Sequence, residues 1–101
     1  MKQDAIIEIG IDGEERLYIK PSSIRFPYMY REALEVQWNS KGLILYGSKP
    51  RKWSYLDWYN QIIRAAREQS CELTLNESTS WFNISDELKS QIMKQSSVKI
   101  N

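Results

Sequence analysis

The residues best suited to chemistry lie in one short segment in the middle of the chain. Its cationic side chains and candidate stacking rings are Lys49, Arg51, Lys52, Trp53 and Tyr55. Cations can neutralise phosphates and aromatic rings can stack on unpaired bases, so this combination suits a phosphate backbone or a single-stranded nucleic acid. Lys41 adds positive charge, and no acidic residue lies between residues 41 and 56. Nucleic acid is therefore a candidate partner.

The same segment also has a purely structural interpretation. Ser54 and Asp57 form an S-x-x-D helix start, and Trp53 and Trp58 have the spacing of a hydrophobic staple. The lysines and arginine would then keep a loop hydrated, Pro50 would stiffen it, and the rings would belong to the core. We favour this interpretation because the net charge is only +1, from 14 basic and 13 acidic residues, and no known RNA-binding motif occurs.

Other aromatic residues form a second group of candidates. Tryptophan and tyrosine dominate protein–protein interfaces when they are exposed, although a small domain also uses such rings to fill its core. Trp58 falls at the border of the apolar face of its helix, where a half-covered ring can meet a partner. The candidate partner-binding residues are Trp58, Trp81, Tyr28 and Tyr30.

Enzymatic chemistry has little support in the composition. The chain has no histidine, so the commonest general base is missing. Its one cysteine, Cys71, falls on the inward phase of a predicted strand, where a thiol packs as a small hydrophobic group. The glycines form no phosphate-binding fingerprint, and a zinc site has almost no ligands. We therefore expect no catalytic residues, no cofactor and no metal.

The N-terminal residues predict a β-hairpin. Its first strand alternates in polarity, with the inward side chains Ala5, Ile7, Ile9 and Ile11. Leu17 and Ile19 continue the pattern in the second strand. To place them on the same face, residue 9 must pair with residue 17, which leaves a three-residue loop at residues 12–14.

A second hairpin is predicted from two apolar runs separated by a turn cluster. Residues 34–38 alternate in polarity, residues 39–42 form the turn, and residues 43–46 are continuously apolar. The unbroken run predicts that the returning strand either is covered on both faces or lies centrally in the sheet.

The rest of the chain predicts two helices and further short strands. The first helix starts at Ser54 and its pattern stops near Ser70, followed by a strand over residues 71–75 and a short one over residues 81–84. Ser85 caps a second, short helix, whose apolar anchors are Leu88, Ile92 and Met93. Val98 and Ile100 form either an edge strand or a frayed end.

Together these elements predict one α+β domain over residues 1–101. We expect a mostly antiparallel sheet of about five or six strands with two helices packed on one face, a two-layer sandwich. The second sheet face is then open, and several aromatic residues can cover it or offer it to a partner: Tyr18, Phe26, Tyr28, Tyr30, Trp38 and Tyr46.

The functional hypothesis is a small binding protein without enzymatic activity, in the cytoplasm, with no metal and no membrane. Its partner is another protein or a second copy, bound through the aromatic sheet face. The alternatives are a nucleic-acid-associated protein that uses residues 49–55 and a histidine-free enzyme. Small domains of this composition occur among bacterial accessory, mobile-element and toxin-neutralising proteins, but no motif in the chain points to one of these groups.

Overall fold

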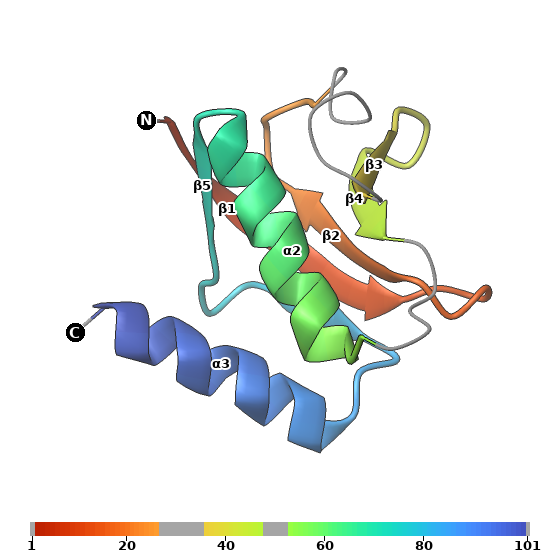
Figure 1. Cartoon of the computed structure of the whole chain (residues 1–101), viewed down its shortest axis with the longest axis vertical. Coiled ribbons are helices and arrows are strands. Elements are labelled where there is room, and N and C mark those ends of the chain that lie inside the picture. The colour runs from red at the N-terminus through yellow and green to blue at the C-terminus, as the bar shows by residue number, and fades with distance from the viewer. Residues whose placement is uncertain (1, 27–35, 48–52, 101) are drawn as a thin grey trace.

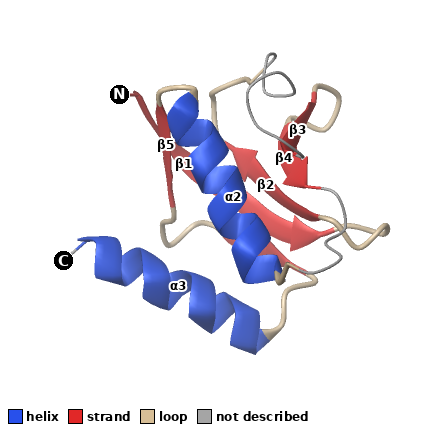
Figure 2. Ribbon diagram, viewed as in Figure 1, coloured by secondary structure: helices blue, strands red, loops and turns tan. Residues whose placement is uncertain are grey.

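The computed structural model describes residues 2–26, 36–47 and 53–100, with side chains as far as residue 95. Its elements are β1 (Lys2–Ile11), β2 (Leu17–Pro21), β3 (Val36–Asn39), β4 (Ile44–Gly47), α2 (Tyr55–Glu68), β5 (Cys71–Thr74), β6 (Ser80–Phe82) and α3 (Asp86–Ile100). The strand order is β3-β4-β2-β1-β5, and β6 also pairs with β1. Both helices lie on the same side of the sheet (Figure 1, Figure 2).

The predicted α+β class is confirmed. Strand β1 pairs antiparallel with β2, β2 with β4, and β4 with β3, whereas β5 and β6 run parallel to β1. The second hairpin is also confirmed. Of the two alternatives that the unbroken apolar run left open for β4, the central position is the one observed, because β4 lies between β3 and β2.

The predicted register of the first hairpin is wrong by two residues. Ile9 pairs with Ile19, and Ile11 pairs with Leu17. The N–H of Asp12 donates to the carbonyl of Arg16 at 3.0 Å, so the three-residue loop begins one position later than expected, at Gly13. The loop closes through Asp12, whose carboxylate accepts hydrogen bonds from the backbone and the guanidinium of Arg16.

The predicted inward face of β1 is also wrong at Ile7. The pairing with β2 shifts between Ile6 and Glu8, which marks a β-bulge. The extra residue lets both Ile6 and Ile9 face the core, at 1% and 0% exposure, while Ile7 is 41% exposed. A prediction based on strict alternation of polarity could not detect that the bulge changes which residues of β1 face the core.

Helix α2 begins as its sequence predicted. The Ser54 hydroxyl accepts a hydrogen bond from the Asp57 N–H, and the Asp57 carboxylate accepts one from the Ser54 N–H, which completes a capping box. Trp53 and Trp58 form the predicted staple, with ring centroids 4.8 Å apart.

The prediction that the Trp58 ring is half-covered at the border of the helix face is wrong. Trp58 lies in the core and is only 3% exposed. Its ring lies against Gly47 of β4: a Cβ built on that glycine would stand 2.2 Å from Trp58 Cε3. The absent side chain leaves the space that the indole fills. Trp58 therefore does not offer a half-exposed ring to a partner.

Helix α3 is longer than expected. Ser85 caps it, with its hydroxyl accepting from the Leu88 N–H at 3.1 Å, and the helix continues to Ile100. Of the two alternatives for Val98 and Ile100, the edge strand is therefore wrong, since no proline or glycine follows the cap to end the helix. Met93 is not an apolar anchor, being 48% exposed.

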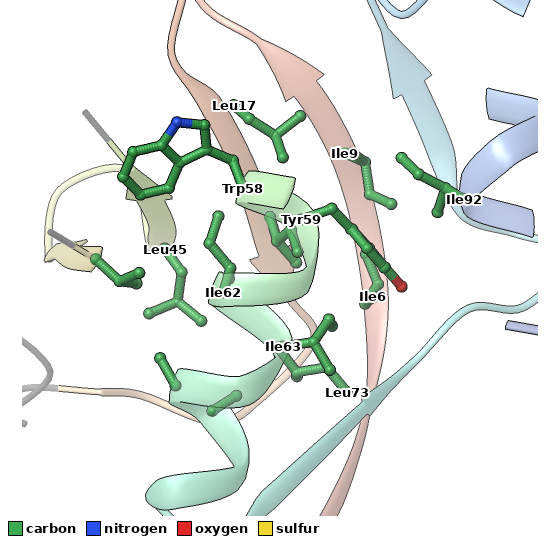
Figure 3. Close-up of a cluster of buried hydrophobic side chains, with 14 of the residues drawn as sticks. Ile6, Ile9, Leu17, Leu45, Trp58, Tyr59, Ile62, Ile63, Leu73 and Ile92 are labelled. Atoms are coloured by element: carbon green, nitrogen blue, oxygen red, sulfur yellow. The ribbon is translucent and has the colours of Figure 1, made fainter. Parts of the chain in front are cut away.

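The core lies between the sheet and the helices (Figure 3). Its members include Ile6, Ile9, Leu17, Leu45, Trp58, Tyr59, Ile62, Ile63, Leu73 and Ile92. Tyr59 from α2 and Ile92 from α3 converge beside Ile9 of β1. Cys71 faces inward as predicted, and burial raises the pKa of its thiol.

Candidate functional site

The face of the sheet opposite the helices carries a row of residues in direct cross-strand register. Phe82 of β6 pairs with Gly10 of β1, Gly10 with Tyr18 of β2, Tyr18 with Tyr46 of β4, and Tyr46 with Gln37 of β3. One line of neighbours thus crosses all strands except β5. We call this line the outer row.

Gly10 shapes the middle of the outer row. A Cβ at this position would lie 2.4 Å from the Tyr18 hydroxyl oxygen, so the tyrosine side chain lies directly over the glycine. A larger residue in β1 would lift the ring. The glycine therefore leaves room for the Tyr18 ring to lie over β1, where its hydroxyl reaches Glu8.

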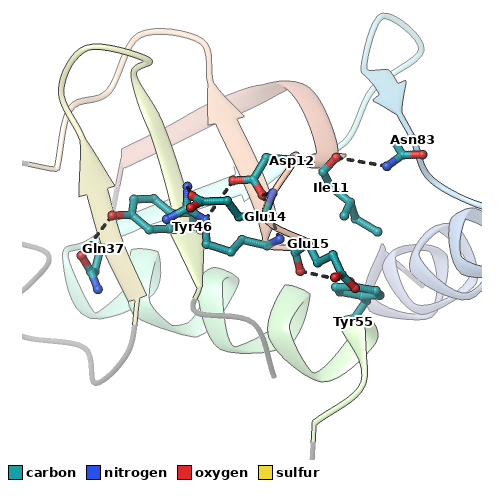
Figure 4. Close-up of polar contacts among 9 residues, drawn as sticks. Ile11, Asp12, Glu14, Glu15, Gln37, Tyr46, Tyr55 and Asn83 are labelled. Atoms are coloured by element: carbon teal, nitrogen blue, oxygen red, sulfur yellow. Dashed lines mark hydrogen bonds and ion pairs between the residues drawn. The ribbon is translucent and has the colours of Figure 1, made fainter. Parts of the chain in front are cut away.

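Hydrogen bonds and one cation–π contact hold the two tyrosines. The Tyr18 hydroxyl donates to Glu8 Oε2 at 2.9 Å, and burial together with this hydrogen bond raises the pKa of Tyr18 to about 12. The Tyr46 hydroxyl donates to Gln37 Oε1 at 3.0 Å (Figure 4). The Arg16 guanidinium carbon lies 4.5 Å from the centre of the Tyr46 ring. Both rings are therefore fixed before any partner arrives.

Two exposed apolar side chains flank the tyrosines. Phe82 is 55% exposed at the β6 end of the outer row. Ile7 is 41% exposed, and the β-bulge places it on the same side as Glu8 and its cross-strand partner Lys20. We define the outer face as the outer row together with Ile7, Glu8 and Lys20. Among the described residues, no helix packs against it (Figure 2).

Four of the aromatic residues that were predicted to lie on the open sheet face are described in the structure, and they divide into two groups. Tyr18 and Tyr46 lie on it, as expected. Phe26 is 2% exposed in the core and contacts Trp38, with ring centroids 5.7 Å apart, so these two rings pack on the helical side instead. The alternation that puts Tyr46 outside puts Trp38 inside, because Trp38 pairs with the buried Leu45.

The other predicted partner residues do not form a site together. Tyr28 and Tyr30 lie outside the described residues. Trp81 pairs with Ile9 and is partly buried on the helical side, where the ammonium of Lys89 lies 5.4 Å from its ring centre. Trp58 belongs to the core.

The residues that sequence reasoning missed are Phe82 and Ile7. Phe82 joins the outer row only because β6 pairs in parallel with β1, a contact between distant parts of the chain. Ile7 is exposed only because of the β-bulge. Neither event leaves a local pattern in the sequence.

The basic and aromatic segment is described only in part. Lys49, Arg51 and Lys52 lie outside the described residues. Trp53 is 42% exposed and packs on Trp58, and the Tyr55 hydroxyl donates to the carbonyl of Glu15 at 3.0 Å (Figure 4). Each ring therefore has a structural contact, and nucleic-acid binding remains a hypothesis from the sequence.

Among the described residues, no group of three or more histidine, cysteine, aspartate or glutamate residues comes together in a way that could hold a metal ion. In the same part of the chain, no helix has the length and apolar character needed to cross a bilayer.

Comparison with known proteins identifies one family. The family described as Integron Cassette Protein Hfx_Cass5 matches residues 4–79. A solved structure of the integron cassette protein Hfx_Cass5, from the mobile metagenome of the North West Arm sewage outfall, is 41% identical, covering 96% of this chain and 98% of that one, with a TM-score of 0.49. No curated protein matches the chain. The chain therefore belongs to the Hfx_Cass5 family of integron cassette proteins.

Proposed function

We propose that this protein acts by binding rather than by catalysis, and that the outer face binds a second copy of the chain. The observation that carries the proposal is the line of side chains on a sheet face that no described helix covers. Tyr18 and Tyr46 are fixed by hydrogen bonds, and Phe82 and Ile7 remain exposed beside them. Fixed aromatic rings with exposed apolar neighbours are typical of the centre of a protein interface.

The charges on and beside the outer face favour a protein over a nucleic acid. Glu8 and Lys20 are cross-strand partners on the face, and Asp12 and Arg16 form an ion pair at the end of the same hairpin. A face with both signs does not attract a polyanion strongly. It can pair with a copy of itself turned by a two-fold rotation, because acidic groups of one copy then meet basic groups of the other.

The dimensions of the molecule set an upper limit on the area that such an interface can bury. The molecule measures 31 × 30 × 23 Å along its principal axes, and the sheet lies across the two longer ones (Figure 1). A standard interface buries about 800 Å² on each partner. Most of the outer face would therefore be covered in a dimer.

Sedimentation equilibrium over a range of protein concentrations tests this proposal. We expect the wild type to form a dimer reversibly. The variant Phe82→Asp should weaken dimerisation by at least about tenfold, since the interface would then have to bury and desolvate a charge in place of the ring. Because Phe82 is more than half exposed in the monomer, the variant should still fold, which circular dichroism and thermal unfolding will verify.

Met93→Asp is the matched control, because Met93 is an apolar residue of similar exposure on the helical side. It should dimerise like the wild type. A wild type that stays monomeric at all concentrations would contradict the proposal. Equal weakening by both variants would also contradict it, since the interface would then not be the outer face.

A further inference from the structure

The charges of the first hairpin are sorted by strand on the outer side of the sheet. Glu8 of β1 pairs in register with Lys20 of β2, and the N–H of Asp12, just after β1, donates to the carbonyl of Arg16, just before β2. Residues two positions apart on a strand share a face, so all four side chains lie on the side of Tyr18. On this side, the β1 arm of the hairpin is acidic and the β2 arm is basic.

The two pairs differ in how far their charges are satisfied within the chain. Arg16 Nε lies 2.9 Å from Asp12 Oδ2, and Arg16 Nη2 lies 2.8 Å from Glu14 Oε2. Glu8 and Lys20 are cross-strand neighbours, but no ion pair joins them among the described residues. The Glu8–Lys20 rung is therefore the part of the charge pattern that is most available to a second copy.

The charge pattern distinguishes two ways of placing a second copy face to face. When two sheets pack with aligned strands, the two-fold axis between them runs either perpendicular or parallel to the strands. A perpendicular axis places each strand over its own equivalent, so acidic β1 lies over β1 and basic β2 over β2. A parallel axis between β1 and β2 places β1 of each copy over β2 of the other. Of these two directions, only the parallel one brings opposite charges together.

The same parallel axis also matches the aromatic side chains. The order across the outer row is Phe82, Gly10, Tyr18 and Tyr46. An axis between Gly10 and Tyr18 therefore brings Phe82 of each copy over Tyr46 of the other. The Tyr18 ring lies over Gly10, so the Tyr18 rings of the two copies meet at the axis. Large rings then occupy the centre of the interface, where such side chains contribute most to affinity.

We infer that the dimer forms about a two-fold axis parallel to the strands, between β1 and β2. This inference rests on the proposed function, because it describes the arrangement of that same dimer. Glu8 of each copy pairs with Lys20 of the other, and Tyr46 packs against Phe82 of the other copy. Glu8 and Lys20 thus select the orientation, whereas the rings supply most of the affinity.

Charge reversals test the direction of the axis, with dimerisation measured by sedimentation equilibrium. In Lys20→Glu the new carboxylate would lie opposite Glu8 of the other copy, at both symmetric contacts. Glu8→Lys would likewise place an ammonium opposite Lys20. Each variant should weaken dimerisation by about tenfold. The double variant Glu8→Lys/Lys20→Glu should dimerise like the wild type, because opposite charges face each other again.

Arg64→Glu is the matched control, since it makes the same charge change at an exposed position of α2, on the helical side. It should dimerise like the wild type, and circular dichroism will verify that every variant is folded. A perpendicular axis over the outer row would place position 20 opposite Arg16 and position 8 opposite Asp12. Both single reversals would then tighten the dimer. That result, or an unchanged affinity in both, would overturn the inferred axis.

These measurements also separate the inferred axis from the proposed function. If Phe82→Asp weakens the dimer and the two single charge reversals do not, the outer face is the interface but the axis is wrong. If the wild type is monomeric, or if Phe82→Asp dimerises like the wild type, the proposed function is wrong and the inferred axis is wrong with it.

Discussion

At the scale of single residues, two glycines decide where large rings lie. Gly10 lets Tyr18 lie on the outer face, and Gly47 lets Trp58 enter the core. Neither glycine has a positive φ, so neither is required for backbone reasons. Each is instead required because a ring occupies the volume that a side chain would need.

The Gly47→Ala variant tests this role. Its new Cβ would lie 2.2 Å from the Trp58 ring, so the indole or the strand must move. We expect the free energy of unfolding to fall by about 1–3 kcal/mol, the usual cost of overpacking a core. Urea denaturation measures the change.

Gly42→Ala is the control for this experiment. The nearest side-chain atom to its Cβ is 3.7 Å away, an ordinary contact, in an exposed turn. The change in stability should stay within about 0.5 kcal/mol. Similar losses in both variants would mean that contact with Trp58 is not the cause.

At the scale of elements, the loop of the first hairpin depends on Asp12. Its carboxylate accepts hydrogen bonds from the backbone of Glu14 and Arg16 and pairs with the Arg16 guanidinium at 2.9 Å. Burial alone would raise the pKa of Asp12, but these hydrogen bonds and the positive charge lower it below its usual 3.8. The ionised form is therefore the one that stabilises the hairpin.

A pH series on Asp12→Asn tests this contribution. A carboxyl group with a lowered pKa in the folded state adds stability above its unfolded pKa, and this stability is lost as the pH falls through the folded value. At neutral pH the variant should be less stable by about 1 kcal/mol or less, because the pair is partly exposed. The difference from wild type should shrink from about pH 5 downward. A difference that is constant with pH would contradict the assignment.

Some features of these elements could be predicted from the sequence, and others could not. Periodicity and caps predicted both hairpins, the start of α2 at Ser54 and the inward position of Cys71, because these depend on neighbours in the chain. The predicted register of the first hairpin was wrong because the hydrogen bonds between Asp12 and Arg16 close the loop one residue later than the polarity pattern indicates. The outer face could be predicted only in part, since Phe82 reaches it through pairing between β6 and β1.

At the scale of the whole molecule, α3 completes the core although it contacts the sheet layer with few residues. Ile92 is fully buried, and Leu88 is 9% exposed. The neighbouring Met93 faces away and is 48% exposed. Only one side of α3 therefore packs into the core of the domain.

The variants Ile92→Ala and Met93→Ala compare the two sides of α3. Removing the Ile92 side chain leaves a cavity between the helices and β1, so we expect a loss of about 2–5 kcal/mol in unfolding free energy. Met93→Ala should change stability by less than about 0.5 kcal/mol. If chemical denaturation gave a small effect for both, α3 would not be part of the cooperative unit.

The position of β1 has a consequence for how the chain folds during synthesis. β1 is synthesised before the other described strands of this domain, yet its early residues pair with Cys71–Thr74 and its later residues with Ser80–Phe82. Among the described strands, only β2 can pair with β1 early, so one edge of β1 stays unpaired until residues 71–82 have been synthesised. Contacts between such distant segments slow folding. The nascent hairpin therefore exposes Ile6 and Ile9 until the later elements of the domain have been synthesised, a period in which a chaperone or another nascent copy can bind them first.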